Sequence, residues 1–240
     1  PCAVKVMRMP ADEAPESLSF FWREGGIGQA IVHPCVLRTF DALEDGAARF
    51  LVMERVFGHT LRAELGQPLE VEKTLSIFEP VSGGLQAAHK AGVIHRDLKP
   101  ENVMIGEGEQ VKILDFGLAK WTRDDSLTLT NQFKGTIDYC APEQISDSRS
   151  ATPACDQFAL GMMVFEALTA RLPYPMESKN PLLNLMERLD LEPVRLRSYR
   201  DELSAEADEV VAKMLSRRPE DRFDSVETAV TVLGTALRTG

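Results

Sequence analysis

Short apolar runs and long helical periodicities are unevenly distributed along this chain. The first 60 residues combine two short apolar runs, which predict strands, with one helical stretch. From residue 71 onward the pattern is mostly helical, and residues 72–91 place apolar side chains close to an i, i+3, i+7 spacing. Two later apolar runs flank Gly-Glu-Gly-Glu at 106–109, which predicts a β-hairpin. The predicted strands are 3–7, 49–53, 103–105 and 111–114, and the predicted helices are 17–32, 72–91, 152–170 and 204–215.

These elements predict a small sheet-rich part followed by a larger helical part. We place the first at residues 1–53, a link at 54–58 and the second at 59–240. A chain of 240 residues is long enough to bury a sizeable core. Because the chain starts at Pro1 and reads as strand almost at once, we expect it to be a fragment or a processed product.

The composition narrows the class of protein. Hydrophobic residues make up 44% and charged residues 27%, which is ordinary for a globular domain and excludes a disordered or collagen-like chain. The net charge of −10 repels phosphate backbones, so we expect no nucleic-acid partner. Four scattered cysteines favour a reducing, cytoplasmic compartment. The richest apolar window, 158–170, is interrupted by Glu166, so we expect a buried helix and no membrane contact from this segment, although an anchor could lie outside it.

A set of ordered motifs carries the chemistry. Residues 95–102 read HRDLKPEN, residues 115–117 read DFG and residues 141–143 read APE. Upstream, AVK at 3–5 precedes Glu24, which stands nine residues before His33. In this order and spacing, the set resembles the eukaryotic-type (Hanks-type) serine/threonine protein kinases over nearly the whole chain. The continuation of APE to Gln144 resembles bacterial members.

The resemblance implies an α+β, two-lobed protein-kinase-like fold and transfer of the ATP γ-phosphate to Ser/Thr hydroxyls of proteins. In this reading residues 1–53 are a partial, truncated N-lobe, 54–58 the hinge and 59–240 a mainly helical C-lobe. The family's glycine-rich loop is lacking, since only four residues precede Lys5, and Gly-Gly-Ile-Gly at 25–28 does not replace it. An ATP site without this loop is expected to bind its nucleotide weakly.

The catalytic residue types suit phosphoryl transfer, which needs positioning and charge neutralisation more than covalent chemistry. Asp97 is expected to accept the hydroxyl proton, and Lys99 to stabilise charge on the transferring phosphate. Asn102 and Asp115 offer hard oxygen ligands for Mg²⁺. The resemblance also implies that Lys5 contacts the α- and β-phosphates and that Glu24 holds the Lys5 ammonium in place.

The resemblance also implies how adenine is recognised. Met53 would guard the back of the pocket, and the backbone of Glu54 and Val56 would read the adenine edge. Ala3 and Met104 would sandwich the ring.

The resemblance also implies regulation through the activation segment, which lies between Asp115 and Glu143. Arg96 directly precedes Asp97, as in kinases whose activation segment is ordered by phosphorylation. A phosphorylated hydroxyl in this segment would pair with Arg96 through charge-assisted hydrogen bonds. Thr128 and Thr130 precede Thr136 at the spacing of bacterial kinases, so we expect autophosphorylation at these two threonines. A dimer of two such domains is one way to phosphorylate them. Solvated hydroxyls in an exposed loop are the simpler alternative.

Several residues are expected to be structural. Glu143 and Arg222 would form a buried ion pair, and Asp156 would support the scaffold. Gly28 and Thr39 stand where relatives place larger apolar residues of the hydrophobic spine. Glycines also weaken a helix by about 1 kcal/mol each, so we expect a mobile helix at 20–31 and a Lys5–Glu24 pair that forms part of the time.

Other functions remain open at this stage. Taken singly, each charged residue above is more simply a surface charge, a turn former or a helix cap. A catalytically silent, truncated kinase or pseudokinase-like interaction module is the main alternative. A small-molecule phosphotransferase of related fold is weaker, because Gly135, Thr136 and the APE motif resemble a platform for protein substrates.

Overall fold

The N-terminal part forms a three-stranded antiparallel sheet. β1 (Cys2–Arg8) and β2 (Thr39–Asp45) both pair with β3 (Ala48–Glu54), which is the central strand. The predicted strands 3–7 and 49–53 are confirmed as β1 and β3. The computed structural model describes residues 1–8, 21–22, 25–26, 28–46, 48–116, 137–146, 151–174, 183–184 and 188–239.

The two faces of this sheet differ. Lys5 lies opposite Leu51 in the β1–β3 register, so both side chains share one face. Leu51 is buried there, and the position a Cβ would take on Gly25 lies 3.3 Å from Leu51 Cδ2, which places the helical residue Gly25 against this face. Val4 and Val6, on the opposite face, are 50% and 54% exposed. The lysine therefore points to the covered side of the sheet.

A second small sheet follows the link after β3. β4 (Gly58–Thr60) pairs with β5 (Val103–Gly106), and β5 pairs with β6 (Val111–Ile113). The hairpin predicted between 103 and 114 is confirmed, with a turn in which Gly108 has a φ of +71° that suits glycine. β4 was not predicted, since three residues, Gly-His-Thr, carry no periodicity.

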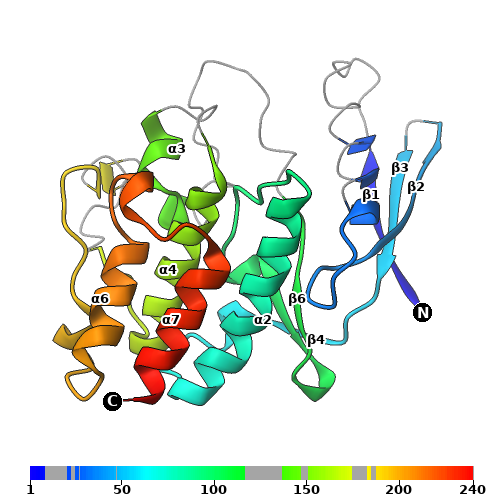
Figure 1. The fold of residues 1–240 in the computed structure, drawn as a ribbon. Helices are drawn as coiled ribbons and strands as arrows, with labels where there is room; N and C mark the ends of the chain where they lie inside the picture. Colours follow the sequence, from blue (N-terminus) through cyan, green and yellow to red (C-terminus); the bar gives the residue numbers. More distant parts are fainter. Residues whose placement is uncertain are drawn as a thin grey trace.

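The rest of the chain is a helical body (Figure 1). α2 (Val71–Lys90), α4 (Pro153–Thr169) and α6 (Ala205–Met214) confirm the three helices predicted there, within one residue at each end. The short α3 (Pro142–Ser146) and α7 (Val226–Arg238) also belong to this body, and Ser204 and Ser225 cap α6 and α7 by accepting a backbone N–H. Single 3₁₀ turns lie at Leu61–Ala63, Pro100–Asn102, Glu107–Glu109, Ile137–Tyr139, Leu196–Ser198 and Pro219–Asp221.

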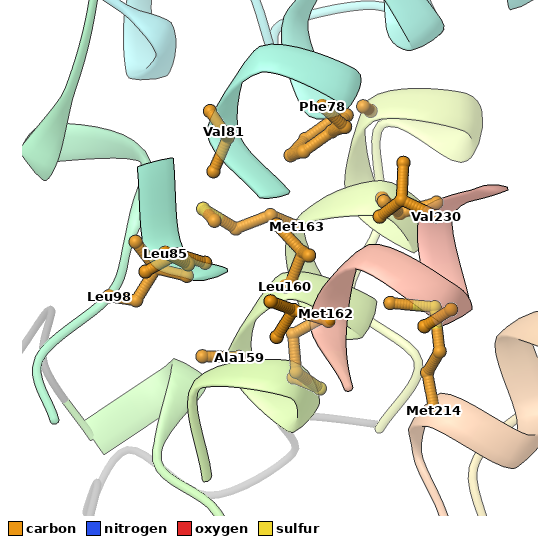
Figure 2. Close-up of a cluster of buried hydrophobic side chains, with 14 of the residues drawn as sticks. Phe78, Val81, Leu85, Leu98, Ala159, Leu160, Met162, Met163, Met214 and Val230 are labelled. Carbon is orange, nitrogen blue, oxygen red and sulfur yellow. The ribbon is translucent and has the colours of Figure 1, made fainter. Parts of the chain in front are cut away.

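α4 is the centre of this body. Its residues 155–169 are all buried, because α2, α6 and α7 pack around it. Figure 2 shows Leu160, Met162 and Met163 of α4 among side chains of α2, α6 and α7. Among the helices that the structure describes, none combines the length and apolar surface that a membrane span requires.

The helix predicted at 17–32 is wrong at its C-terminal end. Residues 21–22, 25–26 and 28–30 are helical, whereas Ile31 and Val32 are not. Pro34 follows shortly and disfavours helical backbone before it. Residues 17–20 lie outside the described residues. β2 was missed because its sequence, TFDALED, is mostly exposed and lacks a clean alternation.

Gly28 and Thr39 fit each other. A Cβ on Gly28 would lie 2.1 Å from Thr39 Oγ1, which no real contact allows. Gly28 and Thr39, at the two positions where apolar spine residues were expected, are therefore matched to each other. The threonine side chain occupies the space that the glycine leaves.

A buried ion pair joins α3 to the segment before α7. The Arg222 guanidinium, whose side chain is fully buried, donates from both Nη atoms to the two Glu143 oxygens, at 2.6 and 2.8 Å. It also donates to the carbonyl oxygens of Ser216 and Ala154. This is the contact expected for Glu143 and Arg222.

Breaking this pair should cost much of the protein's stability. We expect Arg222→Met to lower the free energy of unfolding by about 3–5 kcal/mol, because it leaves the Glu143 carboxylate uncompensated. The control is Arg218→Met, which removes an exposed ion pair with Glu220 and should change the free energy of unfolding far less, because solvent screens exposed pairs. Urea unfolding measures both, and equal losses in the two variants would contradict the assignment.

Candidate active site

One buried carboxylate holds the loop that carries the predicted catalytic residues. Asp156, in the first turn of α4, accepts the His95 N–H at 2.9 Å and the Arg96 N–H at 2.8 Å. It also accepts His89 Nε2 at 2.7 Å from the end of α2. Burial acts to raise the pKa of Asp156, yet these hydrogen bonds and the two histidines hold the pKa below its ordinary value. Asp156 is thus an anionic anchor for a backbone in which Arg96 has a φ of +65°.

The same loop is fastened to the DFG segment. His95 Nε2 donates to the Leu114 carbonyl at 2.9 Å, and the Leu114 N–H donates to the Asn102 carbonyl at 2.8 Å. The His95 and Phe116 rings lie 5.0 Å apart. Residues 95–102 and 114–116 therefore form one unit, although they belong to different parts of the sequence.

Asp97, Lys99 and Asn102 meet at one point of this unit. Lys99 Nζ lies 3.2 Å from Asp97 Oδ2. Asn102 Nδ2 donates to the Asp97 carbonyl at 2.7 Å and approaches its Oδ2 at 3.3 Å. The carboxylate is held in a defined orientation between a cation and an amide, which suits a group that accepts a proton.

Lys5 reaches across from the sheet. Its Nζ lies 3.2 Å from Asp115 Oδ1, so β1 and the DFG segment are joined by an ion pair. Asp115 has a φ of +34°, which marks a constrained backbone at this position. Glu24, the expected partner of Lys5, lies outside the described residues.

The oxygen atoms of this site suit a divalent cation. Because Asn102 Nδ2 is used on Asp97, the amide presents Oδ1 as an acceptor, and Asp115 adds a half-exposed carboxylate. Two such oxygens, completed by phosphate oxygens and water, match the way Mg²⁺ is held in nucleotide sites. Among the described residues, no group of three or more His, Cys, Asp or Glu side chains could hold a metal without such help.

The residues expected around adenine lie at the junction of the two sheets. Ala3 lies directly opposite Met53 in the β1–β3 register. Val56 packs close to Gly106 at the end of β5, where a Cβ would lie 3.1 Å from the valine Cγ1. Met104 lies in the middle of β5. The Glu54 side chain is turned to Lys112, whose Nζ is 2.7 Å from Oε2.

The end of the activation segment is held against the helical body. Arg62 Nη1 donates to Glu166 Oε1 at 2.7 Å and Nε donates to Glu101 Oε1 at 2.9 Å. The Tyr139 hydroxyl donates to Glu166 and accepts from Arg62. Gln144 Nε2 donates to the Arg96 carbonyl at 3.0 Å, which links this segment to the catalytic loop.

The expected phosphorylation sites cannot be placed. Thr128, Thr130 and Thr136 lie outside the described residues, as does Gly135. Arg96 is among the described residues: its backbone N–H donates to Asp156, and its carbonyl accepts from the Gln144 side chain.

Sequence reasoning missed three residues that organise this site: His89, Arg62 and Lys112. Only Lys112 had a local signal, since it interrupts an apolar run between Val111 and Ile113 and a lysine in a buried strand needs a partner. The partners of His89 and Arg62 lie 67 and up to 104 residues away along the chain.

Comparison with known proteins identifies the family of this chain. The family described as the protein kinase domain matches residues 1–232. The chain belongs to the protein kinase domain family. It is 37% identical over 227 residues to the serine/threonine-protein kinase PknL of Mycobacterium tuberculosis and 28% identical over 237 residues to the serine/threonine-protein kinase PrkC of Bacillus subtilis.

This kinase domain accounts for only part of those relatives. The matches cover 93% of this chain but 56% of PknL, and 98% of this chain but 36% of PrkC. The chain thus spans about half of PknL and about a third of PrkC. Its α+β architecture is that of the kinase domain they share.

The role of Asp156 can be tested in the backbone it holds. We expect Asp156→Asn to speed hydrogen exchange at the His95 and Arg96 amides about tenfold or more, because the amide replaces a carboxylate that accepts both N–H groups. Asp208→Asn is the matched control, since Asp208 also accepts a backbone N–H, from Arg197, but lies away from this loop. Equal exchange at residues 95 and 96 in both variants would sink the assignment.

Proposed function

We propose that this chain is a serine/threonine protein kinase domain that transfers the ATP γ-phosphate to Ser/Thr hydroxyls of protein substrates. The observation that carries the proposal is the convergence of Asp97, Lys99 and Asn102 at one point, with Lys5 and Asp115 paired beside the same unit. These residues come from three separate segments. A merely structural set of charges would not require this combination of two carboxylates, two cations and an amide.

The chemistry assigned to each residue follows from its contacts. Asp97 accepts the proton of the substrate hydroxyl as the hydroxyl oxygen bonds to the γ-phosphorus. The bond from that phosphorus to the β–γ bridging oxygen breaks, and ADP leaves. Lys99, next to the Asp97 carboxylate, stabilises charge on the phosphoryl group as it moves.

ATP would be held from both sides of the junction. Lys5 contacts the α- and β-phosphates, and the backbone of Glu54 and Val56 reads the adenine edge between Ala3 and Met104. Asn102 and Asp115 hold Mg²⁺, which supplies positive charge to the phosphates when bound. Met53 closes the back of the adenine pocket, and Glu24 orients Lys5.

The proposal extends to acceptor class and compartment. Lys99, two residues after Asp97, and the Gly135-Thr136 pair favour Ser/Thr over Tyr acceptors. All four cysteines, Cys2, Cys35, Cys140 and Cys155, are free thiols in the structure, which suits a cytoplasmic site of action.

Removing the proposed base should abolish transfer but keep nucleotide binding. We expect Asp97→Asn to lower phosphate transfer from labelled ATP to a basic protein substrate about a hundredfold or more, with affinity for a fluorescent ADP analogue within about threefold. Asp190→Asn, a change at a side chain that is 89% exposed, is the control and should leave both unchanged.

The alternatives give different results in the same assay. Nucleotide binding by the unmodified chain without transfer to any protein would favour the silent interaction module. Transfer to small alcohols or aminoglycosides but not to proteins would favour a small-molecule phosphotransferase. Transfer that is as fast in Asp97→Asn as in the unmodified chain would contradict the role of Asp97.

Incubation with Mg-ATP should place phosphate on the activation segment. We expect mass spectrometry to find it at Thr128 and Thr130, where it would pair with Arg96. If two domains phosphorylate each other, the initial rate per molecule should rise with protein concentration. An active protein with neither threonine modified would overturn this assignment.

A further inference from the structure

A buried lysine contacts the first residue of the segment proposed to read the adenine edge. Lys112, in the middle of β6, is 5% exposed. Its Nζ lies 2.7 Å from Glu54 Oε2, and Glu54 is its only ion-pair partner among the described residues. Removing an ammonium from water is costly unless a counter-charge compensates it, so the lysine depends on this carboxylate.

The groups around this ammonium leave Glu54 as its compensating charge. Burial and the Lys112 charge lower the pKa of His33 below its ordinary value, so the ring is neutral at pH 7. Burial raises the pKa of Cys35 to about 12, so its thiol is neutral too. Among the described residues, Lys112 and Glu54 therefore form a two-member ion pair beside the neutral His33 and Cys35 side chains.

The pair joins the two sheets. Glu54 is the last residue of β3, and its backbone N–H donates to the Arg38 carbonyl at 2.8 Å. Lys112 lies opposite Met104 in the β5–β6 register, so both side chains share one face of the second sheet. The carboxylate of Glu54 is thus tied to the sheet that carries Met104, while its backbone starts the link to β4.

We propose that Lys112 is a positioning residue for the nucleotide: by holding the Glu54 side chain, it fixes the Glu54–Val56 backbone in the orientation that reads the adenine edge. The inference rests on the proposed function, since it assigns to Lys112 a role in ATP recognition. Lys112 itself touches neither the phosphates nor the acceptor in this assignment. Its loss should affect nucleotide selection and leave the chemical step alone.

The first test measures selection of the base. Purine riboside triphosphate lacks the 6-amino group that a hinge carbonyl accepts, and we expect the unmodified chain to show an about tenfold lower KM for ATP than for this analogue. In Lys112→Met this ratio should fall below about threefold, with KM for ATP raised about tenfold and kcat within about twofold. A lysine that only stabilises the fold would leave the ratio unchanged.

Matched variants separate the pair from general effects. Glu54→Gln keeps the shape and removes the charge, so it should shift the ratio in the same direction, and it serves if Lys112→Met does not fold. Lys112→Arg restores a cation and should recover part of the selectivity. Lys73→Met, which removes ion pairs with Glu109 and Glu64 on an exposed part of α2, should behave as the unmodified chain.

A second measurement does not depend on activity. In the nucleotide-free protein, Lys112→Met should speed hydrogen exchange at the amides of residues 53–57 about tenfold, whereas Lys73→Met should not. If the unmodified chain neither binds nor turns over ATP, the proposed function fails and this exchange still decides whether Lys112 holds the link. Unchanged exchange in both Lys112→Met and Glu54→Gln, or an unchanged ATP selectivity in an active enzyme, would overturn the proposal.

Discussion

The candidate active site depends on the hydrogen bonds that Asp156 accepts. Residues 95–99 lie outside regular secondary structure, so their backbone N–H groups have no strand or helix partners and need other acceptors. The carboxylate supplies two of them and takes a third hydrogen bond from His89. Its position in the first turn of α4 also favours negative charge. The left-handed backbone at Arg96 is tolerated because α4, buried on all sides, holds this acceptor in place.

The junction between the two sheets is built on residues 33–38 and β6. The Ile113 N–H donates to the Cys35 carbonyl at 2.6 Å, and the Leu37 N–H donates to the Ile113 carbonyl at 2.9 Å. Gly84 of α2 leaves the room this contact needs, because a Cβ there would lie 2.9 Å from Ile113 Cδ1. The ion pairs Lys5–Asp115 and Lys112–Glu54 cross the same junction. The junction is therefore held by backbone hydrogen bonds and by two ion pairs.

Two arginines of the helical body, the half-buried Arg62 and the buried Arg222, play similar parts. Arg62 and Arg222 each bind carboxylates that come from distant segments, and both residues hold the region that follows the activation segment. Each guanidinium offers several donors in a fixed plane, so one side chain can order more than one loop. These arginines connect α3 and Tyr139 to the body in which the catalytic loop is anchored.

Local pattern was sufficient to predict much of this protein. Periodicity predicted α2, α4, α6 and the 103–114 hairpin, because each buries one face or its whole surface and repeats at the period of its own backbone. The motif order predicted the family and named Asp97, Lys99, Asn102 and Asp115. β4 was not predicted, because a strand of three residues is defined by its pairing with β5 and is too short to show a pattern of its own.

What only the tertiary structure decided is which distant groups meet. The sequence determined that two carboxylates, an amide and two lysines stand in the order typical of a kinase, because short motifs and their spacing can be read directly along the chain. It did not determine that Gly28 makes room for Thr39, that His89 shares Asp156 with the catalytic loop, or that Lys112 is buried against Glu54. Those contacts depend on how the helices pack and how the strands pair. The residue that compensates a charge or fills a space is far away along the chain, so no local sequence pattern identifies it.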